Sequence, residues 1–103
     1  MTYTKNDKPK VYNIDFDHTL TADDPGTYPD DPAPEYNMIK AIQRIHIQGN
    51  IIIIWTARQW NNAPFLASWL TRYSVPYHGL KMEKGGSDVY LDDKMMSIGE
   101  FLK

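Results

Sequence analysis

The sequence has no cysteine, no long apolar run and no excess of positive charge. Without cysteine, the 103 residues can form neither disulfide bonds nor thiolate metal sites. The longest aliphatic run, residues 51–54, is far too short to cross a membrane, and the polar N-terminus lacks the apolar centre of a signal peptide. The formal net charge of -2 argues against duplex nucleic acid and anionic membranes as partners. These absences lead us to expect a soluble cytoplasmic protein.

The length and composition indicate one globular domain over residues 1–103. Hydrophobic residues make up 42% of the chain and charged residues 23%, which is an ordinary balance for a folded domain. Residues 1–9 are polar and predict a flexible tail. Residues 21–34 hold four prolines and a glycine and predict a loop. No segment is long enough for a cap domain, so this loop can form only a flap.

Four stretches have the pattern of β-strands. Residues 10–16 are rich in β-branched and aromatic residues. Residues 50–56 contain a continuous apolar run, which is typical of a strand buried on both faces in a parallel sheet. Residues 75–80 and 88–93 predict two shorter strands, the second ending in two aspartates.

Three stretches predict helices: residues 34–48, 62–73 and 97–103. In the first, Met38, Ile42 and Ile45 share one helical face. In the second, the shared face is formed by Phe65, Leu66, Trp69, Leu70 and Tyr73. The boundary signals are Pro34 and Pro64 in the first turns, Asn62 as a cap and Gly49 as a stop.

Strands that alternate with helices predict a parallel sheet, and ligands of such sheets bind beyond the carboxyl ends of the strands. Polar side chains follow three of the predicted strands at that edge. They are Asp15, Asp17 and Thr19 after the first strand, Thr56 and Arg58 after the second, and Asp92 and Asp93 after the last. The sequence therefore predicts one site built from these residues.

Aspartates from different strand ends would form an oxygen-rich pocket. With no cysteine and no histidine pair at ligand spacing, the ion that suits it is Mg²⁺, which also binds substrate phosphate. In phosphoryl transfer, one carboxylate can attack phosphorus and a second carboxyl group can move the proton. Asp15 and Asp17 suit these two roles.

The transferred phosphoryl group also needs hydrogen-bond donors. The Thr56 hydroxyl, backbone N–H groups and a lysine would serve. Lys81 and Lys84 precede the last predicted strand, and Lys94 lies beyond it. For Arg58 two roles stay open, because it could contact the substrate or only pair with a nearby acid.

Four motifs spanning residues 11–94 resemble those of haloacid-dehalogenase (HAD) superfamily phosphatases with little or no cap domain. The first is the DxDxT of residues 15–19, after an apolar strand. The second is Thr56 at the end of an apolar strand, and the third is a lysine ahead of the last strand. The fourth is the acidic pair Asp92 and Asp93. His18 departs from the pattern, since most members have glycine there.

The resemblance implies a Rossmann-like three-layer sandwich with a small, mostly parallel sheet. It implies a Mg²⁺-dependent phosphatase that forms an aspartyl-phosphate, with Asp15 as nucleophile and Asp17 as acid/base. The metal ligands would be the Asp15 carboxylate, the main chain of Asp17 and Asp92, with Asp93 assisting. The spacing between lysine and strand is similar to that of small bacterial and phage hydrolases of this type, which favours Lys84 over Lys81.

Three functions remain as alternatives. The first is hydrolysis of a small phosphorylated substrate, a nucleotide or sugar phosphate, in a site completed by the flap or by a second subunit. The second is phosphotransfer to an acceptor other than water. The third is a non-catalytic protein used for binding or assembly. Trp55, Trp60 and Trp69 are expected to pack against other side chains rather than to stack on a base, although Trp60, which follows the second motif, could line the pocket.

Overall fold

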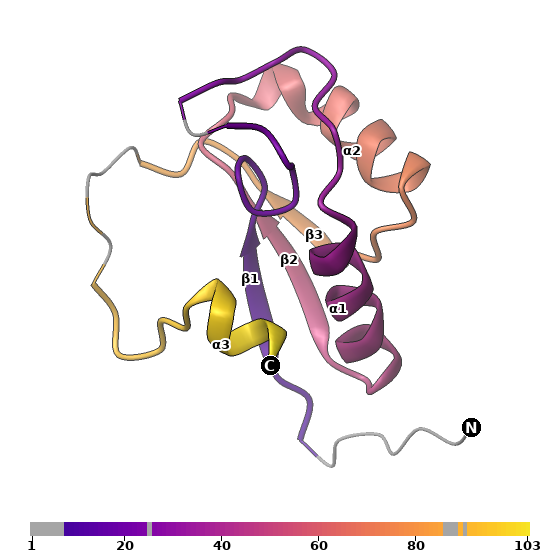
Figure 1. The fold of residues 1–103 in the computed structure, drawn as a ribbon, viewed down its shortest axis with the longest axis vertical. Helices are drawn as coiled ribbons and strands as arrows, with labels where there is room; N and C mark the ends of the chain where they lie inside the picture. The colour runs from indigo at the N-terminus through magenta and orange to yellow at the C-terminus, as the bar shows by residue number, and fades with distance from the viewer. Residues whose placement is uncertain (1–7, 25, 86–88, 90) are drawn as a thin grey trace.

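Three parallel strands form one sheet in the order β1-β2-β3 (Figure 1). The computed structural model describes residues 8–24, 26–85, 89 and 91–103. The strands are β1 (Val11–Asp15), β2 (Ile51–Trp55) and β3 (Gly79–Lys81). The helices are α1 (Tyr36–Ile47), the short 3-10 helix η1 (Trp60–Asn62), α2 (Ala63–Arg72) and α3 (Ile98–Leu102). The chain is thus a small α/β domain, as the alternating pattern predicted.

The register of the sheet brings the strand ends into one row. Asp15 pairs with Trp55, and Trp55 pairs with Lys81 on its other side. All three strands run in the same direction, so the segments that follow them leave the sheet at the same edge. This edge is where the predicted site residues of β1 and β2 were expected to meet.

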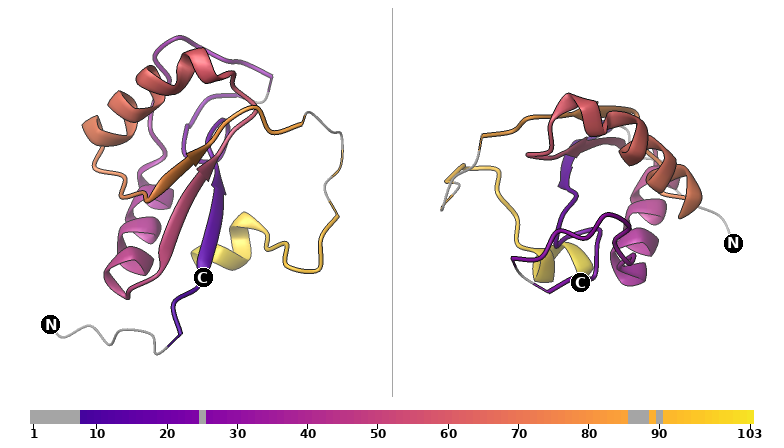
Figure 2. Two further views of the ribbon diagram at one scale, coloured as in Figure 1. Left: turned by 180° about the vertical axis from the view of Figure 1, so that it is seen from behind. Right: turned by 90° about the horizontal axis from the view of Figure 1, so that it is seen from above.

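The sheet is covered by helices on one face. Side chains alternate between the two faces of a strand, and the even-numbered ones point into the core, where Ile14, Ile52 and Ile54 are buried. On the other face Val11 is 60% exposed and Ile51 is 36% exposed. Viewed from behind, no helix crosses this face in the described part of the chain (Figure 2). The expectation of a strand buried on both faces was therefore wrong for β2, whose odd-numbered side chains are exposed or half-buried.

The α1 helix buries its apolar face and has clear ends. Glu35 is its N-cap, and its carboxylate accepts a hydrogen bond from the Asn37 N–H. The helix ends before Gly49, whose φ of 95° is a left-handed conformation that glycine adopts readily. Gly49 is thus the predicted stop, whereas Pro34 lies just before the cap rather than in the first turn. The buried residues are Met38, Ile39, Ala41 and Ile42.

The α2 helix carries the largest buried side chain of the core. Pro64 lies in its first turn, as predicted. Asn62 occupies the N-cap position, but its amide donates to Asn61 and makes no capping bond. Trp69 is 1% exposed, and its ring meets Phe16 edge to face with the ring centroids 4.9 Å apart. This contact joins α2 to the segment that follows β1.

The two later strands differ from the prediction. The third strand covers residues 79–81, not 75–80, because Pro76 has no N–H to donate and the His78 ring takes over part of the pairing. His78 Nδ1 accepts from the Ile52 N–H at 3.0 Å. The predicted fourth strand lies partly outside the described residues, at 86–88 and 90, and its described positions 89 and 91–93 are not in a strand. There Lys94 N–H bonds back to Asp92, which forms a turn.

The C-terminal helix α3 forms as predicted. Ser97 caps it by accepting from the Glu100 N–H. Phe101 meets the Tyr12 ring at 5.9 Å, so α3 packs on the covered face of the sheet beside β1. None of the helices in residues 8–24, 26–85, 89 and 91–103 is long and apolar enough to cross a membrane.

Candidate active site

Asp15 ends β1 and forms an ion pair with Lys84. Lys84 Nζ lies 2.9 Å from Asp15 Oδ1, which also accepts from the Phe16 N–H at 3.1 Å. The Lys84 side chain is only 12% exposed, whereas that of Asp15 is 44% exposed. Within the described residues, Asp15 Oδ2 accepts no hydrogen bond. Asp15 therefore keeps one carboxylate oxygen accessible while the other is held in place.

Asp17 lies two residues further on and is held by Arg58. The guanidinium donates from Nε to Oδ2 at 3.1 Å and from Nη2 to Oδ1 at 2.8 Å. The Arg58 side chain is 16% exposed and that of Asp17 is 15% exposed. The guanidinium also lies 5.3 Å from the ring centroids of Phe16 and Phe65. This two-point pair fixes the orientation of both side chains.

Thr56 ties the end of β2 to the segment that carries Lys84. Its side chain is buried, and Oγ1 accepts from the Arg58 N–H at 3.1 Å. Its carbonyl oxygen accepts from the Lys84 N–H at 2.9 Å. The Glu83 N–H donates to the Arg58 carbonyl oxygen at 2.8 Å. Hydrogen bonds around Thr56 thus hold the backbone of both Arg58 and Lys84 in place.

The two candidate lysines differ in what they contact. Both ammonium groups lie over the Trp55 ring, at 5.5 Å for Lys81 and 5.1 Å for Lys84. Of the two, Lys84 also reaches a carboxylate, whereas Lys81 is exposed and makes no carboxylate contact in the described part of the chain. The geometry therefore places Lys84, and not Lys81, at Asp15.

His18 follows Asp17 in a left-handed conformation. Its φ is 62°, which is uncommon for a residue with a side chain and explains why glycine suits this position. The Thr21 hydroxyl accepts from the His18 N–H at 2.8 Å. The ring reaches into the flap, with Nε2 2.7 Å from the Thr27 carbonyl oxygen and the ring centroid 4.9 Å from that of Tyr28. Sequence reasoning gave His18 no specific partner.

The stem of the 21–34 flap is fixed to the domain. Thr21 and Pro34 form an antiparallel bridge, and the Ala22 N–H bonds to the Ala33 carbonyl oxygen at 2.8 Å. The buried Trp69 indole N–H donates to the Pro32 carbonyl oxygen at 2.9 Å. The flap lies at the end of the molecule where the strands terminate (Figure 1). The described residues of the flap stem therefore border the strand ends, where the sequence placed the flap.

The structure does not bring Asp92 and Asp93 to Asp15 and Asp17. The segment 91–97 runs away from the strand ends along the side of the sheet (Figures 1 and 2). No group of three or more His, Asp or Glu residues in the described ranges is arranged to hold a metal ion. The pKa of Asp92 is lowered by the hydrogen bond from the Lys94 backbone N–H, then by its bond with Asp93 and the Lys94 charge. The predicted four-residue metal set is thus not assembled here.

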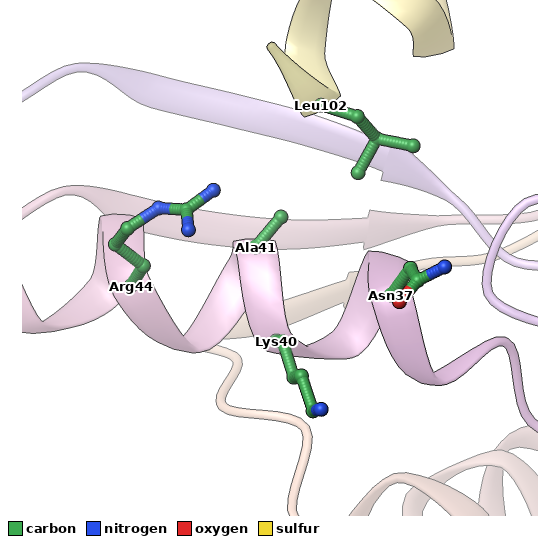
Figure 3. Close-up of a pocket in the computed structure, with 5 residues that line it drawn as sticks. All are labelled: Asn37, Lys40, Ala41, Arg44 and Leu102. Carbon is green, nitrogen blue, oxygen red and sulfur yellow. The ribbon is translucent and has the colours of Figure 1, made fainter.

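One hollow in the surface lies away from these residues. It measures about 330 Å³ and lies between α1 and α3, with Ala41 facing Leu102. Asn37 and Arg44 flank Ala41 on α1, and Lys40 points away from Leu102 (Figure 3). None of the site carboxylates lines it. The candidate active site at the strand ends is therefore separate from this hollow.

Comparison with known proteins supports the fold. The chain resembles the crystal structure of a structural-genomics target from Vibrio cholerae, with 28% sequence identity and a TM-score of 0.77. The likeness covers 90% of this chain and 87% of that one. No protein-family model and no curated protein matches the chain. The class established by the fold is a small α/β domain with a parallel sheet.

Proposed function

We propose that the chain is a Mg²⁺-dependent phosphomonoesterase of HAD type that acts through an aspartyl-phosphate. The observation that carries the proposal is the pair of adjacent carboxylates at the end of β1, each matched with its own cation. Lys84 contacts Asp15 and Arg58 contacts Asp17. An ionised nucleophile needs a nearby cation, and a transferred phosphoryl group needs positive charge and donors around it.

In the first step, Asp15 Oδ2 attacks phosphorus and the bond from phosphorus to the leaving oxygen breaks. This oxygen is free of hydrogen bonds within the described residues, and the opposite oxygen is held by Lys84 and the Phe16 N–H. The Lys84 ammonium group lies 2.9 Å from the Asp15 carboxylate and is near enough to share its donors with the phosphoryl oxygens. The Thr56 hydroxyl is the additional donor that we assign to the phosphoryl group.

Asp17 transfers the proton in both steps. Its carboxyl group protonates the leaving oxygen in the first step. In the second step water attacks the aspartyl-phosphate, gives its proton to the Asp17 carboxylate and releases phosphate as the bond to Asp15 breaks. Both oxygens of Asp17 accept from Arg58. The pair must therefore open, and we propose that Arg58 moves to the substrate phosphate when it binds, as phosphate offers the same two-point geometry.

Mg²⁺ fits the donor chemistry of the site in part. The Asp15 carboxylate and the Asp17 carbonyl are hard oxygen donors, and this ion commonly uses only one or two carboxylates together with water and phosphate. When bound, it would neutralise charge on the phosphoryl oxygens. We retain Asp92 and Asp93 as proposed ligands. To bind the same ion as Asp15, the 91–97 segment would have to lie nearer to Asp15 than it does in this structure.

The substrate that we propose is a small phosphomonoester, a nucleotide or a sugar phosphate. The flap borders the site, and Arg58 and Lys84 supply positive charge. The net charge of -2 argues against long nucleic acids. A second subunit that covers the site would serve the same purpose as a cap domain.

The test is phosphate release from p-nitrophenyl phosphate with Mg²⁺ or with chelator. We expect turnover by the parent protein in Mg²⁺ and a loss of about 10³-fold or more in Asp15→Asn, which cannot attack phosphorus. Asp30→Asn is the matched control, because Asp30 is an exposed carboxylate on the flap without a described partner. Activity that survives in Asp15→Asn would refute the assigned nucleophile.

The two alternative functions give different results in the same assay. A phosphotransferase would release nitrophenol faster than inorganic phosphate once an alcohol acceptor such as glycerol is added. A binding protein would release neither product from any phosphomonoester in a screen. The presence of both paired carboxylates favours an enzyme over a binding protein, and only the assay separates the hydrolase from the phosphotransferase.

A further inference from the structure

The tip of the flap is attached to the domain through His18. The flap stem has its own contacts, from the Thr21–Pro34 bridge to the buried Trp69–Pro32 bond. In the tip, residues 26–30, the hydrogen bonds and ring contacts to the rest of the described chain come from His18, which reaches Thr27 and Tyr28. The tip is otherwise closed on itself by the bonds from Thr27 to the Asp24 carbonyl oxygen.

This attachment joins an exposed aromatic ring to the residue that follows Asp17. Tyr28 is 66% exposed, although His18 holds one edge of its ring with an interplanar angle of 62°. His18 directly follows Asp17, so the ring is anchored one residue away from the proposed acid/base. Exposed aromatic side chains fixed in one orientation lose little conformational freedom when a ligand packs on them.

The backbone conformation of His18 indicates that its side chain has a role that glycine could not fill. A left-handed φ of 62° suits glycine and strains a residue that has a Cβ atom. A glycine would form the same turn, but it could not reach Thr27 or Tyr28. The side chain therefore contributes the flap contact at the expense of backbone strain.

We propose that His18 is a positioning residue that holds the Tyr28 ring at the edge of the site, where the ring packs against an aromatic group of the phosphorylated substrate. This inference rests on the proposed function. It narrows the substrate class from any small phosphomonoester to one with a planar aromatic group close to the phosphate, such as a nucleoside or aryl phosphate. A sugar phosphate has no such group for Tyr28 to contact.

The experiment measures binding and not turnover. Calorimetry in Mg²⁺ compares phenylphosphonate with methylphosphonate, which share the phosphorus-centred anion and differ in the ring. We expect the parent to bind phenylphosphonate about tenfold more tightly, a ratio that corresponds to about 1.4 kcal/mol. The ratio of the two dissociation constants within one variant cancels any general loss of folded protein.

Three variants test the assignment. Tyr28→Leu should remove the preference for the phenyl compound. His18→Gly should also remove most of it while the midpoint of thermal unfolding stays the same or rises, because glycine relieves the backbone strain. Tyr36→Leu is the matched control, since Tyr36 is also an exposed tyrosine, 60% exposed on α1, and in the described residues its ring contacts neither His18 nor Tyr28. It should keep the tenfold ratio.

Every other result overturns the inference. A parent that binds the two phosphonates equally, or binds neither, has no aromatic contact at the site. A preference that persists in Tyr28→Leu, or that is lost in Tyr36→Leu, places the contact elsewhere. Failure of the proposed function is seen separately, because a parent that prefers phenylphosphonate but hydrolyses no phosphomonoester would retain the binding inference and lose the catalytic one.

Discussion

Arg58 donates to both carboxylate oxygens of Asp17, at 3.1 and 2.8 Å, across a sequence separation of 41 residues. The guanidinium packs between two phenylalanine rings, and its own backbone N–H is held by the Thr56 hydroxyl. The Asp17 carboxylate, the two rings and the Thr56 hydroxyl thus all contribute to the orientation of Arg58 in the absence of a ligand. The pair joins the end of β1 to the segment after β2.

Arg58→Lys should lower both activity and stability. Lysine keeps the charge but cannot donate to two oxygens in a fixed plane, nor stack on the two rings in the same way. We expect kcat/KM to fall about 10- to 100-fold and the free energy of unfolding to fall by about 1–2 kcal/mol. Phosphate release and urea denaturation measure the two effects.

Arg72→Lys provides the control for that substitution. Arg72 pairs with Asp31 at 3.2 Å, but the two side chains are 58% and 62% exposed. An exposed ion pair of this kind contributes little, so stability should change by less than about 0.5 kcal/mol. Equal losses in both variants would show that the orientation of Arg58 has no special importance.

Lys84→Met and Lys81→Met should separate the two lysines of the site. Both lie over Trp55, so each substitution removes a similar cation–π contact. Only the first removes the ammonium group from Asp15. We expect kcat/KM to fall about 10²-fold or more in Lys84→Met and less than about threefold in Lys81→Met. A larger loss in Lys81→Met would reverse the assignment of the catalytic lysine.

Thr56→Val should destabilise the protein through a lost acceptor. The Arg58 N–H would remain without its partner at a partly buried position, which typically costs about 1 kcal/mol or more. Thr56→Ser keeps the hydroxyl and should retain most of the stability and activity. Chemical denaturation of the two variants tests the structural role. If the Thr56 hydroxyl also donates to the phosphoryl group, as proposed, kcat should fall in Thr56→Val even when the assay is corrected for the fraction of unfolded protein.

Asp92→Asn tests whether the acidic pair takes part in metal binding. If Asp92 is a ligand, the Mg²⁺ concentration for half-maximal activity should rise about tenfold or more, because one anionic oxygen is lost. Asp30→Asn should leave it unchanged. An unaltered Mg²⁺ requirement in Asp92→Asn would agree with the structure, in which the 91–97 segment runs away from the strand ends.

Local patterns predicted most of the elements. The strands at β1 and β2 and all three α-helices lie where apolar periodicity and the glycine and proline signals placed them, because these signals act within one or two turns of the chain. The third strand was predicted too long at its start, since the His78 ring replaces a backbone partner and such a contact has no sequence pattern. The open sheet face was missed because an isoleucine run does not reveal whether a helix covers each side.

The sequence by itself determined which residues are proposed to carry the chemistry. Aspartates two residues apart at the end of an apolar strand, a threonine at the end of the next, and basic residues nearby can be recognised from residue type and spacing. Only the tertiary structure decided the pairings: Lys84 with Asp15 across 69 positions, Arg58 with Asp17, and the His18 ring with the flap. The reason is geometric, because parallel strands align distant residues at one edge, and that alignment depends on the register and loop paths rather than on local sequence.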